Sequence, residues 1–346
     1  MRLRWRLCWR YRRVGIRHVQ ASSLSERVGF TASQRHIPKK PIWLCDAVFR
    51  VLSDRLLGVY SLSSSASCYN GAGVTLFDDL VFHVKQDSHA RRTRVLVVTN
   101  QKGGVGKTTT AVNLAGEFVR RGQHVLLIDS DPQGNATTSL GVAKRSLSIT
   151  IYDLLMQTAD VRSAIMTTGR ERFDLIPADE DLAGAAIALA GIDRREWRLR
   201  DALDQIATGY DHVIIDCPPS LGLLTLNALC AADSVLIPLQ CEYLALEGLA
   251  QLKGTLDRVR DGLNPSLRII GVVMTMYDVR TKLAQQVVED VQRHFPHLIC
   301  RTLISRSVRI SEAPSYGKLI AEYDPLGRSA QSYAALADEV LQREEL

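Results

Sequence analysis

From residue 94 onward, short and continuous apolar runs alternate with longer amphipathic segments. The apolar runs lie at residues 95–99, 124–128, 212–217, 234–239 and 269–275. Apolar residues recur with helical spacing at 108–121, 245–263, 281–295 and 328–346. Continuous apolar strands that alternate with helices are typical of a parallel sheet buried on both faces. The pattern therefore predicts an α/β fold, with a mostly parallel sheet and helices on both of its faces.

A glycine-rich loop joins the first predicted strand to the first predicted helix. Three glycines allow the backbone to curl, so that successive amide groups point at an anion, and the helix adds its positive N-terminal end. Lys107 then supplies a charge to the outer phosphates, and the Thr108 hydroxyl can ligate Mg²⁺. This order predicts a P-loop NTPase. The predicted nucleotide-binding residues are Lys102, Gly103, Gly104, Val105, Gly106, Lys107, Thr108 and Thr109.

Acidic residues follow two of the apolar runs. Asp129 and Asp131 come directly after residues 124–128, and Asp216 ends the run at 212–217. The carboxyl ends of strands are where open α/β folds bind ligands, and a single carboxylate there can hold a metal ion through water. A polar turn with a helix cap would also explain the segment from 129 to 135. Cys217 lacks the histidine and asparagine partners of a nucleophile, which favours a packed thiol.

A second lysine in the loop, Lys102, narrows the class. Lys-Gly-Gly-Val-Gly-Lys-Thr-Thr resembles the deviant Walker A motif of the ParA/MinD ATPases, and residues 129–135 match the Asp-x-Asp-Pro-Gln-Gly-Asn motif of that family. The resemblance implies an ATPase that dimerises with ATP and uses Mg²⁺. It implies catalytic roles for Lys102, Lys107 and Asp131, with Lys102 reaching the partner's nucleotide and Asp131 positioning the attacking water. Thr108, Asp129 and Asp216 would then form or support the metal site.

Two further segments, 278–281 and 305–314, resemble the same family. ParA proteins have arginines at the positions of Arg280 and Arg309, on a surface that holds DNA without reading its sequence. Physically this requires only cations that face phosphates, although an isolated arginine is more often just a solvated side chain. Relatives commonly have Ile-Pro-Arg-Asn where this chain has Ile-Ser-Arg-Ser at 304–307, near the base of the nucleotide. Contacts to adenine are therefore not carried over to this stretch.

The resemblance extends from Thr93 to the end of the chain and is strongest to the small, Soj-type chromosomal ParA proteins. It implies partitioning of chromosomes or plasmids with a ParB/Spo0J-like centromere-binding protein, and a cytoplasmic, nucleoid-associated location. One alternative is a MinD-like ATPase that cycles on membranes, but such proteins end in a basic amphipathic helix. Acidic residues at 344–345 would repel an anionic bilayer, so we expect no stable membrane association. A metabolic P-loop ATP-dependent enzyme is the other alternative, against which Lys102 and the 129–135 segment argue.

The net charge of +6 hides an uneven distribution. Residues 1–86 hold 14 Lys and Arg against 5 Asp and Glu, and residues 87–346 hold the other 29 against 32, a net charge of −3. The basic character therefore belongs to the leading segment. Seven cysteines without paired spacing are typical of reduced thiols in a cytosolic protein.

Residues 1–90 show no sustained helical or strand period. An arginine-rich, acid-poor start is compatible with an organellar transit peptide or with a basic arm that binds nucleic acid. A third interpretation is upstream DNA translated from a start codon assigned too early. Residues 81–86 can be encoded by the palindrome TGTTTCACGTGAAACA, which resembles a partition site and favours this third interpretation. We expect two parts: an N-terminal extension over 1–90 and the ATPase domain over 91–346.

Overall fold

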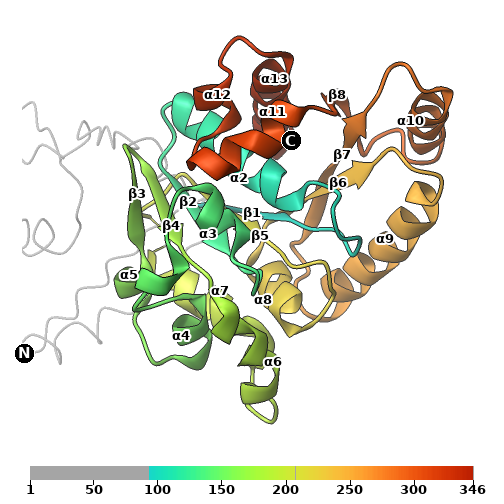
Figure 1. Cartoon of the computed structure of the whole chain (residues 1–346). Helices are drawn as coiled ribbons and strands as arrows, with labels where there is room; N and C mark the ends of the chain where they lie inside the picture. The colour runs from blue at the N-terminus through green and yellow to red at the C-terminus, as the bar shows by residue number, and fades with distance from the viewer. Residues whose placement is uncertain (1–92, 207, 346) are drawn as a thin grey trace, which may run out of the picture. The chain divides into compact units, whose positions relative to one another are not determined.

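The computed structural model describes residues 93–206 and 208–345, which form a layered α/β structure (Figure 1). Within these residues the strands make one eight-stranded sheet. Its spatial order is β3 (Met166–Arg170), β4 (Phe173–Ile176), β2 (Val125–Asp129), β5 (His212–Asp216), β1 (Arg94–Val98), β6 (Ser234–Gln240), β7 (Arg268–Tyr277) and β8 (Ile299–Ser305). Neighbouring strands are parallel except for the antiparallel pair β3 and β4. The predicted mostly parallel sheet is confirmed.

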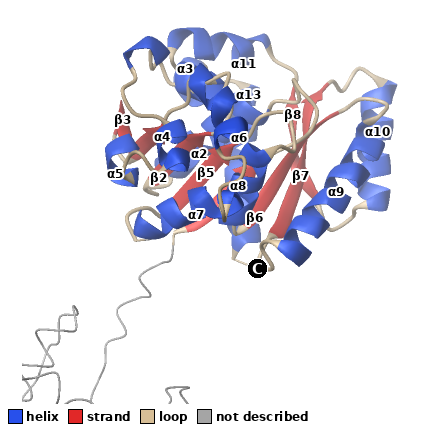
Figure 2. Cartoon of the chain, turned by 90° about the horizontal axis from the view of Figure 1, so that it is seen from below, coloured by secondary structure: helices blue, strands red, loops and turns tan. Residues whose placement is uncertain are grey.

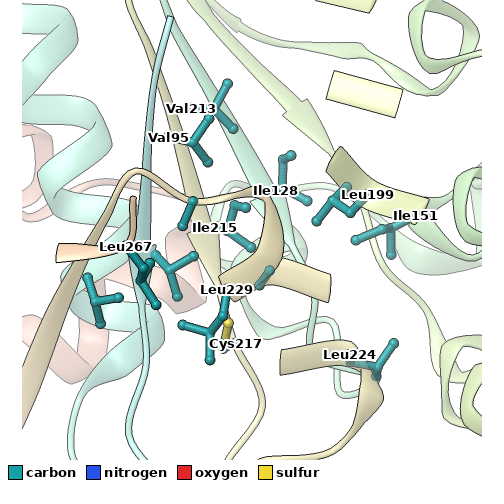
Figure 3. Close-up of a cluster of buried hydrophobic side chains, with 14 of the residues drawn as sticks. Val95, Ile128, Ile151, Leu199, Val213, Ile215, Cys217, Leu224, Leu229 and Leu267 are labelled. Atoms are coloured by element: carbon teal, nitrogen blue, oxygen red, sulfur yellow. The ribbon is translucent and has the colours of Figure 1, made fainter. Parts of the chain in front are cut away.

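The central strands are buried on both faces. In β1, Val95 and Val97 pack into one hydrophobic cluster, while Leu96 and Val98 pack into a second cluster on the opposite face. Figure 3 shows part of the first cluster, in which strand residues meet Leu199 and other helix residues. Because every position of such a strand is buried, its sequence is a continuous apolar run instead of an alternating one.

Helices cover each face of the sheet (Figure 2). One cluster is completed by α2 (Lys107–Arg120), α3 (Asn135–Ser139), α12 (Ile320–Tyr323) and α13 (Arg328–Glu344), with α11 (Val308–Glu312) beside it. The opposite cluster is completed by α4 (Ile151–Met156), α5 (Val161–Ala164), α6 (Ala185–Ala188), α7 (Arg198–Leu203), α8 (Leu223–Ala231), α9 (Ala245–Gly262) and α10 (Lys282–His294). The helices predicted at 108–121, 245–263, 281–295 and 328–346 correspond to α2, α9, α10 and α13, with ends that differ by at most two residues.

The parallel arrangement places the loops that follow β1, β2, β5, β6 and β7 at one edge of the sheet. These loops carry the glycine-rich segment, the acidic segment after β2, Asp216 and the turn into α9. Asp129 and Asp216 are direct neighbours across β2 and β5. The two regions that the sequence predicted separately therefore meet at the carboxyl edge. The predicted division at residues 90 and 91 lies outside the described residues.

Candidate active site

The glycine-rich loop is anchored between β1 and β7. The Thr275 hydroxyl donates a hydrogen bond to the Val105 carbonyl over 2.8 Å, although the two residues lie 170 positions apart. Gly106 has a φ of 85°, a left-handed conformation that favours glycine, and its carbonyl accepts the first bond of α2 from the Thr110 amide. The loop thus turns directly into the N-terminus of a 14-residue helix, where amide groups are available to an anion.

Lys107 lies inside this loop, with 6% of its surface exposed. Its ammonium donates to the carbonyl of Lys102 over 3.0 Å. Burial lowers the pKa of Lys107, and the nearby carboxylates of Asp216 and Asp131 act in the opposite direction. A buried ammonium at the start of a helix attracts phosphate strongly. A bound phosphate would replace the interactions with water that the ammonium loses on burial.

Asp216 is the acid of the site whose carboxylate is least compensated by its surroundings. It is fully buried, and neither carboxylate oxygen has a hydrogen-bond partner among residues 93–206 and 208–345. Burial raises its pKa well above the ordinary value, and the charge of Asp129 adds to the rise, while the nearby Thr108 hydroxyl opposes it. A buried carboxylate with two free oxygens beside a hydroxyl is a donor set that fits Mg²⁺, which takes its other ligands from phosphates and water.

Asp129 has a different environment from Asp216. One of its oxygens accepts hydrogen bonds from both the amide and the hydroxyl of Thr137, each over 2.8 Å, and the other accepts from the Asp131 amide over 3.2 Å. Burial nevertheless raises its pKa to about 6. Since its oxygens are already hydrogen-bonded, Asp129 holds the acidic loop in shape and can support a metal ion only through its charge. Thr137 was not predicted, because its segment shows only a polar turn in the sequence.

The loop that carries Asp131 is a tight turn before α3. The Asp131 carboxylate accepts from the Gln133 amide over 2.9 Å, and its carbonyl accepts from the Gly134 amide over 2.8 Å. Gly134 has a φ of 58°, and a Cβ there would lie 2.7 Å from the Ala178 carbonyl oxygen, so this turn requires glycine. Asp131 is therefore fixed in position near Lys107 and Asp216, whose pKa values respond to its charge.

Lys102 lies at the rim of the site, and 49% of its side chain is exposed. Its ammonium forms an ion pair with Glu242, in the turn between β6 and α9. The side chain of Asn100 accepts from the Lys102 amide over 3.1 Å and donates to the Pro238 carbonyl over 2.7 Å. The two lysines of one loop thus face different surroundings. Glu242 was not predicted, because the sequence contains no sign of a contact across 140 positions.

Arg280 and Arg309 lie on the surface, with 84% and 61% of their side chains exposed. Arg280 donates two hydrogen bonds to Asp278, over 2.9 and 2.7 Å, and this contact lowers the pKa of Asp278 to about 2. Arg309 lies 3.4 Å from Glu312, and its guanidinium is 5.8 Å from the centre of the Tyr323 ring. Both arginines stand outside the buried acidic group and can reach a surface ligand.

Arg306 is a third exposed arginine in this region, and its charge also lowers the pKa of Asp278. Arg306 belongs to the segment 305–314, within which only Arg309 was predicted to contact DNA. Arg306 also lines a pocket of about 310 Å³ that adjoins the start of α2 at Thr109. Ser305 and Ser307 line the same pocket. Met276, at the end of β7, has a φ of 51°, which is strained for a residue with a side chain.

Two secondary expectations concern Cys217 and the end of the chain. Cys217 is buried, and burial raises the pKa of its thiol well above the ordinary value, as expected of a packed thiol. Glu344 is one of the two acidic residues at the end of the chain. This residue is buried and lies 2.9 Å from the His212 ring nitrogen, because α13 packs along the sheet. No helix within the described residues is long and apolar enough to cross a membrane.

Comparisons with known proteins agree with this geometry. A family model described as an AAA domain matches residues 93–269. The chromosome partitioning protein ParA of Caulobacter vibrioides is 53% identical over 257 residues, which cover 74% of this chain and 96% of that protein. The sporulation initiation inhibitor protein Soj of Bacillus subtilis is 53% identical over 247 residues, which cover 71% of this chain and 98% of Soj.

Two solved structures show the same fold. A cobyrinic acid a,c-diamide synthase from Mycobacterium smegmatis, with a bound ATP analog and magnesium, is 38% identical with a TM-score of 0.65, over 73% of this chain and 96% of that chain. The cell division ATPase MinD of Pyrococcus furiosus is 25% identical with a TM-score of 0.61, over 72% of this chain and 98% of that chain.

Proposed function

The chain belongs to the ParA/Soj family of chromosome-partitioning ATPases, and on this basis we propose that it works as a dimer switched by ATP on DNA. Two copies close on ATP and Mg²⁺, and the closed dimer holds DNA of any sequence through exposed arginines. A ParB-like protein bound at a centromere-like site then stimulates hydrolysis and release. The chain acts in the cytoplasm, in association with the nucleoid.

The catalytic roles follow the surroundings of each group. Lys107 and the amide groups of the loop bind the outer phosphates, while Asp216 and the Thr108 hydroxyl hold the metal ion. A bound Mg²⁺ would supply positive charge that neutralises the outer phosphates. Asp131 orients the attacking water, and Asp129 fixes Asp131 through its amide.

The observation that carries the dimer proposal is the contrast between the two lysines. Lys107 is buried in its own loop, whereas Lys102 is half exposed at the rim. A second cation that faces solvent is available to the nucleotide of another copy. Such a trans contact adds positive charge where negative charge develops in the transition state, and two-fold symmetry supplies it to both sites at once.

The dimer is tested with Asp131→Ala, which should bind ATP but fail to position water. With ATP and Mg²⁺ this variant should accumulate as a dimer in light scattering, because binding is retained while hydrolysis is lost. The same variant with Lys102→Ala added is the matched control, and it should stay monomeric. An Asp131→Ala chain that remains a monomer with ATP and Mg²⁺ would refute the proposal.

DNA binding is tested with Arg280→Glu and Arg309→Glu. Each should weaken binding of the ATP dimer to DNA of any sequence, and the wild-type affinity should fall steeply with salt, because phosphate contacts release counterions. ATP affinity should not change, since both side chains lie outside the buried acidic group. Arg258→Glu, an exposed arginine of α9, is the control for net charge. DNA binding that survives both reversals excludes these arginines as the contact surface.

The metabolic alternative has one observation in its favour, the likeness to a diamide synthase. A metabolic enzyme would hydrolyse ATP with a small acid substrate and without regard to DNA. The discriminating measurement is the ATPase rate with and without non-specific DNA and the DNA-bound partner protein. Against the MinD-like alternative, α13 buries Tyr333, Leu336 and Val340 in the core, so this helix has its apolar face covered.

A further inference from the structure

The ion pair between Lys102 and Glu242 has no role in the cycle described so far. Lys102 is expected to contact the nucleotide of the other subunit. In the single chain, however, its ammonium forms an ion pair with the carboxylate of Glu242. We propose that Glu242 is a latch that holds Lys102 in the open protein and competes with closure of the dimer. This inference rests on the proposed trans contact of Lys102.

The backbone on both sides of the pair is fixed. Asn100 links the two sides, because its side chain binds both the Lys102 amide and the Pro238 carbonyl of β6. Beyond β6, the Glu242 amide donates to the Gln240 carbonyl over 2.8 Å, and the Glu242 carbonyl accepts from the Ala245 amide over 3.0 Å. The carboxylate is thus presented by a closed turn at the start of α9. Lys102 can exchange partners by rotating its side chain, with no movement of the loop.

The pair is strong enough to direct the lysine and weak enough to open. The side chains are 49% and 43% exposed, and ion pairs at such positions contribute little, because water competes with them. A triphosphate carries several negative charges in a site that closure shields from water, so it outcompetes a single carboxylate. Without nucleotide on the opposite subunit, Lys102 stays paired with Glu242 of its own chain. The latch therefore makes dimerisation less favourable when ATP is absent.

The same turn continues into an exposed apolar pair. Tyr243 and Leu244 directly follow Glu242, with 83% and 63% of their surface exposed. A second copy that approaches closely enough to receive Lys102 must pass over this turn. The Lys102–Glu242 pair therefore opens on the same surface on which Tyr243 and Leu244 become covered. A second copy of the chain occupies that surface.

The experiment measures the dimer dissociation constant of full-length Asp131→Ala chains with ATP and Mg²⁺, with and without Glu242→Gln. One exposed ion pair corresponds to roughly a two- to five-fold effect, and two pairs open per dimer, so the constant should fall by about 4- to 25-fold. The difference should shrink at high salt, where the pair is already screened. Glu247→Gln removes an exposed carboxylate five positions further on, in α9, and should change nothing.

An unchanged or higher dissociation constant in the Glu242→Gln chain would overturn the latch, provided that dimerisation still requires Lys102. A dimer that forms equally well with Lys102→Ala would overturn the trans contact, and the latch with it. The salt series separates the latch from a loss of folding, because a damaged turn would weaken the dimer at every salt concentration.

Discussion

Replacing Asp216 by asparagine should stabilise the nucleotide-free protein and destroy its response to Mg²⁺ and ATP. The side chain is fully buried, its two oxygens lack hydrogen-bond partners among the described residues, and burial together with Asp129 raises its pKa. Asparagine has nearly the same shape without the charge. The change removes a buried charge and its repulsion from neighbouring carboxylates, and it also removes the proposed metal ligand.

The neighbouring acid sets the scale of the effect. The pKa of Asp129 rises from 3.8 to about 6, and at 1.36 kcal/mol per unit this corresponds to roughly 3 kcal/mol of lost unfolding free energy above pH 6. The pKa of Asp216 is also raised, first by burial and then by the charge of Asp129. Because a buried amide also costs about 1–2 kcal/mol without partners, we expect a net gain of about 1–3 kcal/mol. For a domain of this size that is a rise of roughly 2–10 °C in Tm.

The pH dependence has a definite sign. A carboxyl group whose pKa is raised by folding destabilises the protein increasingly as pH rises above its ordinary value, and the loss is complete above the raised pKa. The stability advantage of Asp216→Asn should therefore be small near pH 4 and largest near pH 8. The exposed substitution Asp204→Asn is the control and should leave Tm nearly unchanged at every pH.

Thermal unfolding of the full chain, followed by circular dichroism, tests the reasoning. Without nucleotide the variant should melt above the wild type, and with saturating ATP and Mg²⁺ the order should reverse, because only the wild type gains the stabilisation of a bound ligand. A variant that melts below the wild type without nucleotide would mean that Asp216 is net stabilising. The assignment of its free oxygens to a metal ion would then lose its physical basis.

Two further predictions concern the DNA surface and the N-terminal segment. Asp278→Asn should raise DNA affinity a few-fold at low salt, because it frees Arg280 from a competing carboxylate; a filter-binding series would contradict this if affinity fell or stayed constant. A chain that starts at Arg91 should melt at the same temperature and hydrolyse ATP at the same rate as the full chain; a lower Tm would show that residues 1–90 contribute to folding.

The core of the fold could be predicted because its strands are buried on both faces. β1, β2, β5, β6 and β7 are each a continuous apolar run, and an amphipathic helix follows or precedes most of them. The sheet edges could not be predicted in this way. β3, with the sequence Met-Thr-Thr-Gly-Arg, is half exposed and contains no apolar run, and the helices α4 to α7 are too short to show a helical period.

The residues of the site also differ in whether they could be predicted from the sequence. Lys107, Thr108, Asp131 and Asp216 lie within local motifs, so their place at the carboxyl edge of the sheet could be predicted from neighbouring residues. The residues that hold them in place could not. Thr275 supports the loop from 170 positions away, and Thr137 fixes Asp129 through a turn that the sequence presents only as polar. Such contacts depend on the packing of the sheet and leave no pattern in either partner's own segment.

From the charges of the site we infer the order in which Mg²⁺, nucleotide and a second copy of the chain bind. Among the described residues, the site holds three buried carboxylates, Asp129, Asp131 and Asp216, and the buried ammonium of Lys107. Burial is the main cause that raises the pKa values of Asp129 and Asp216, and the neighbouring carboxylates add to the rise. In the proposed cycle, a bound Mg²⁺ would compensate the charge of the acids, and the triphosphate would compensate the charges of Mg²⁺ and Lys107. Phosphate charge would then remain at the rim of the site, where we propose that the Lys102 of a second copy binds. Under this proposal, loss of the γ-phosphate would remove most of that attraction, so that the pairing of Lys102 with Glu242 in the single chain would compete again and the dimer would open.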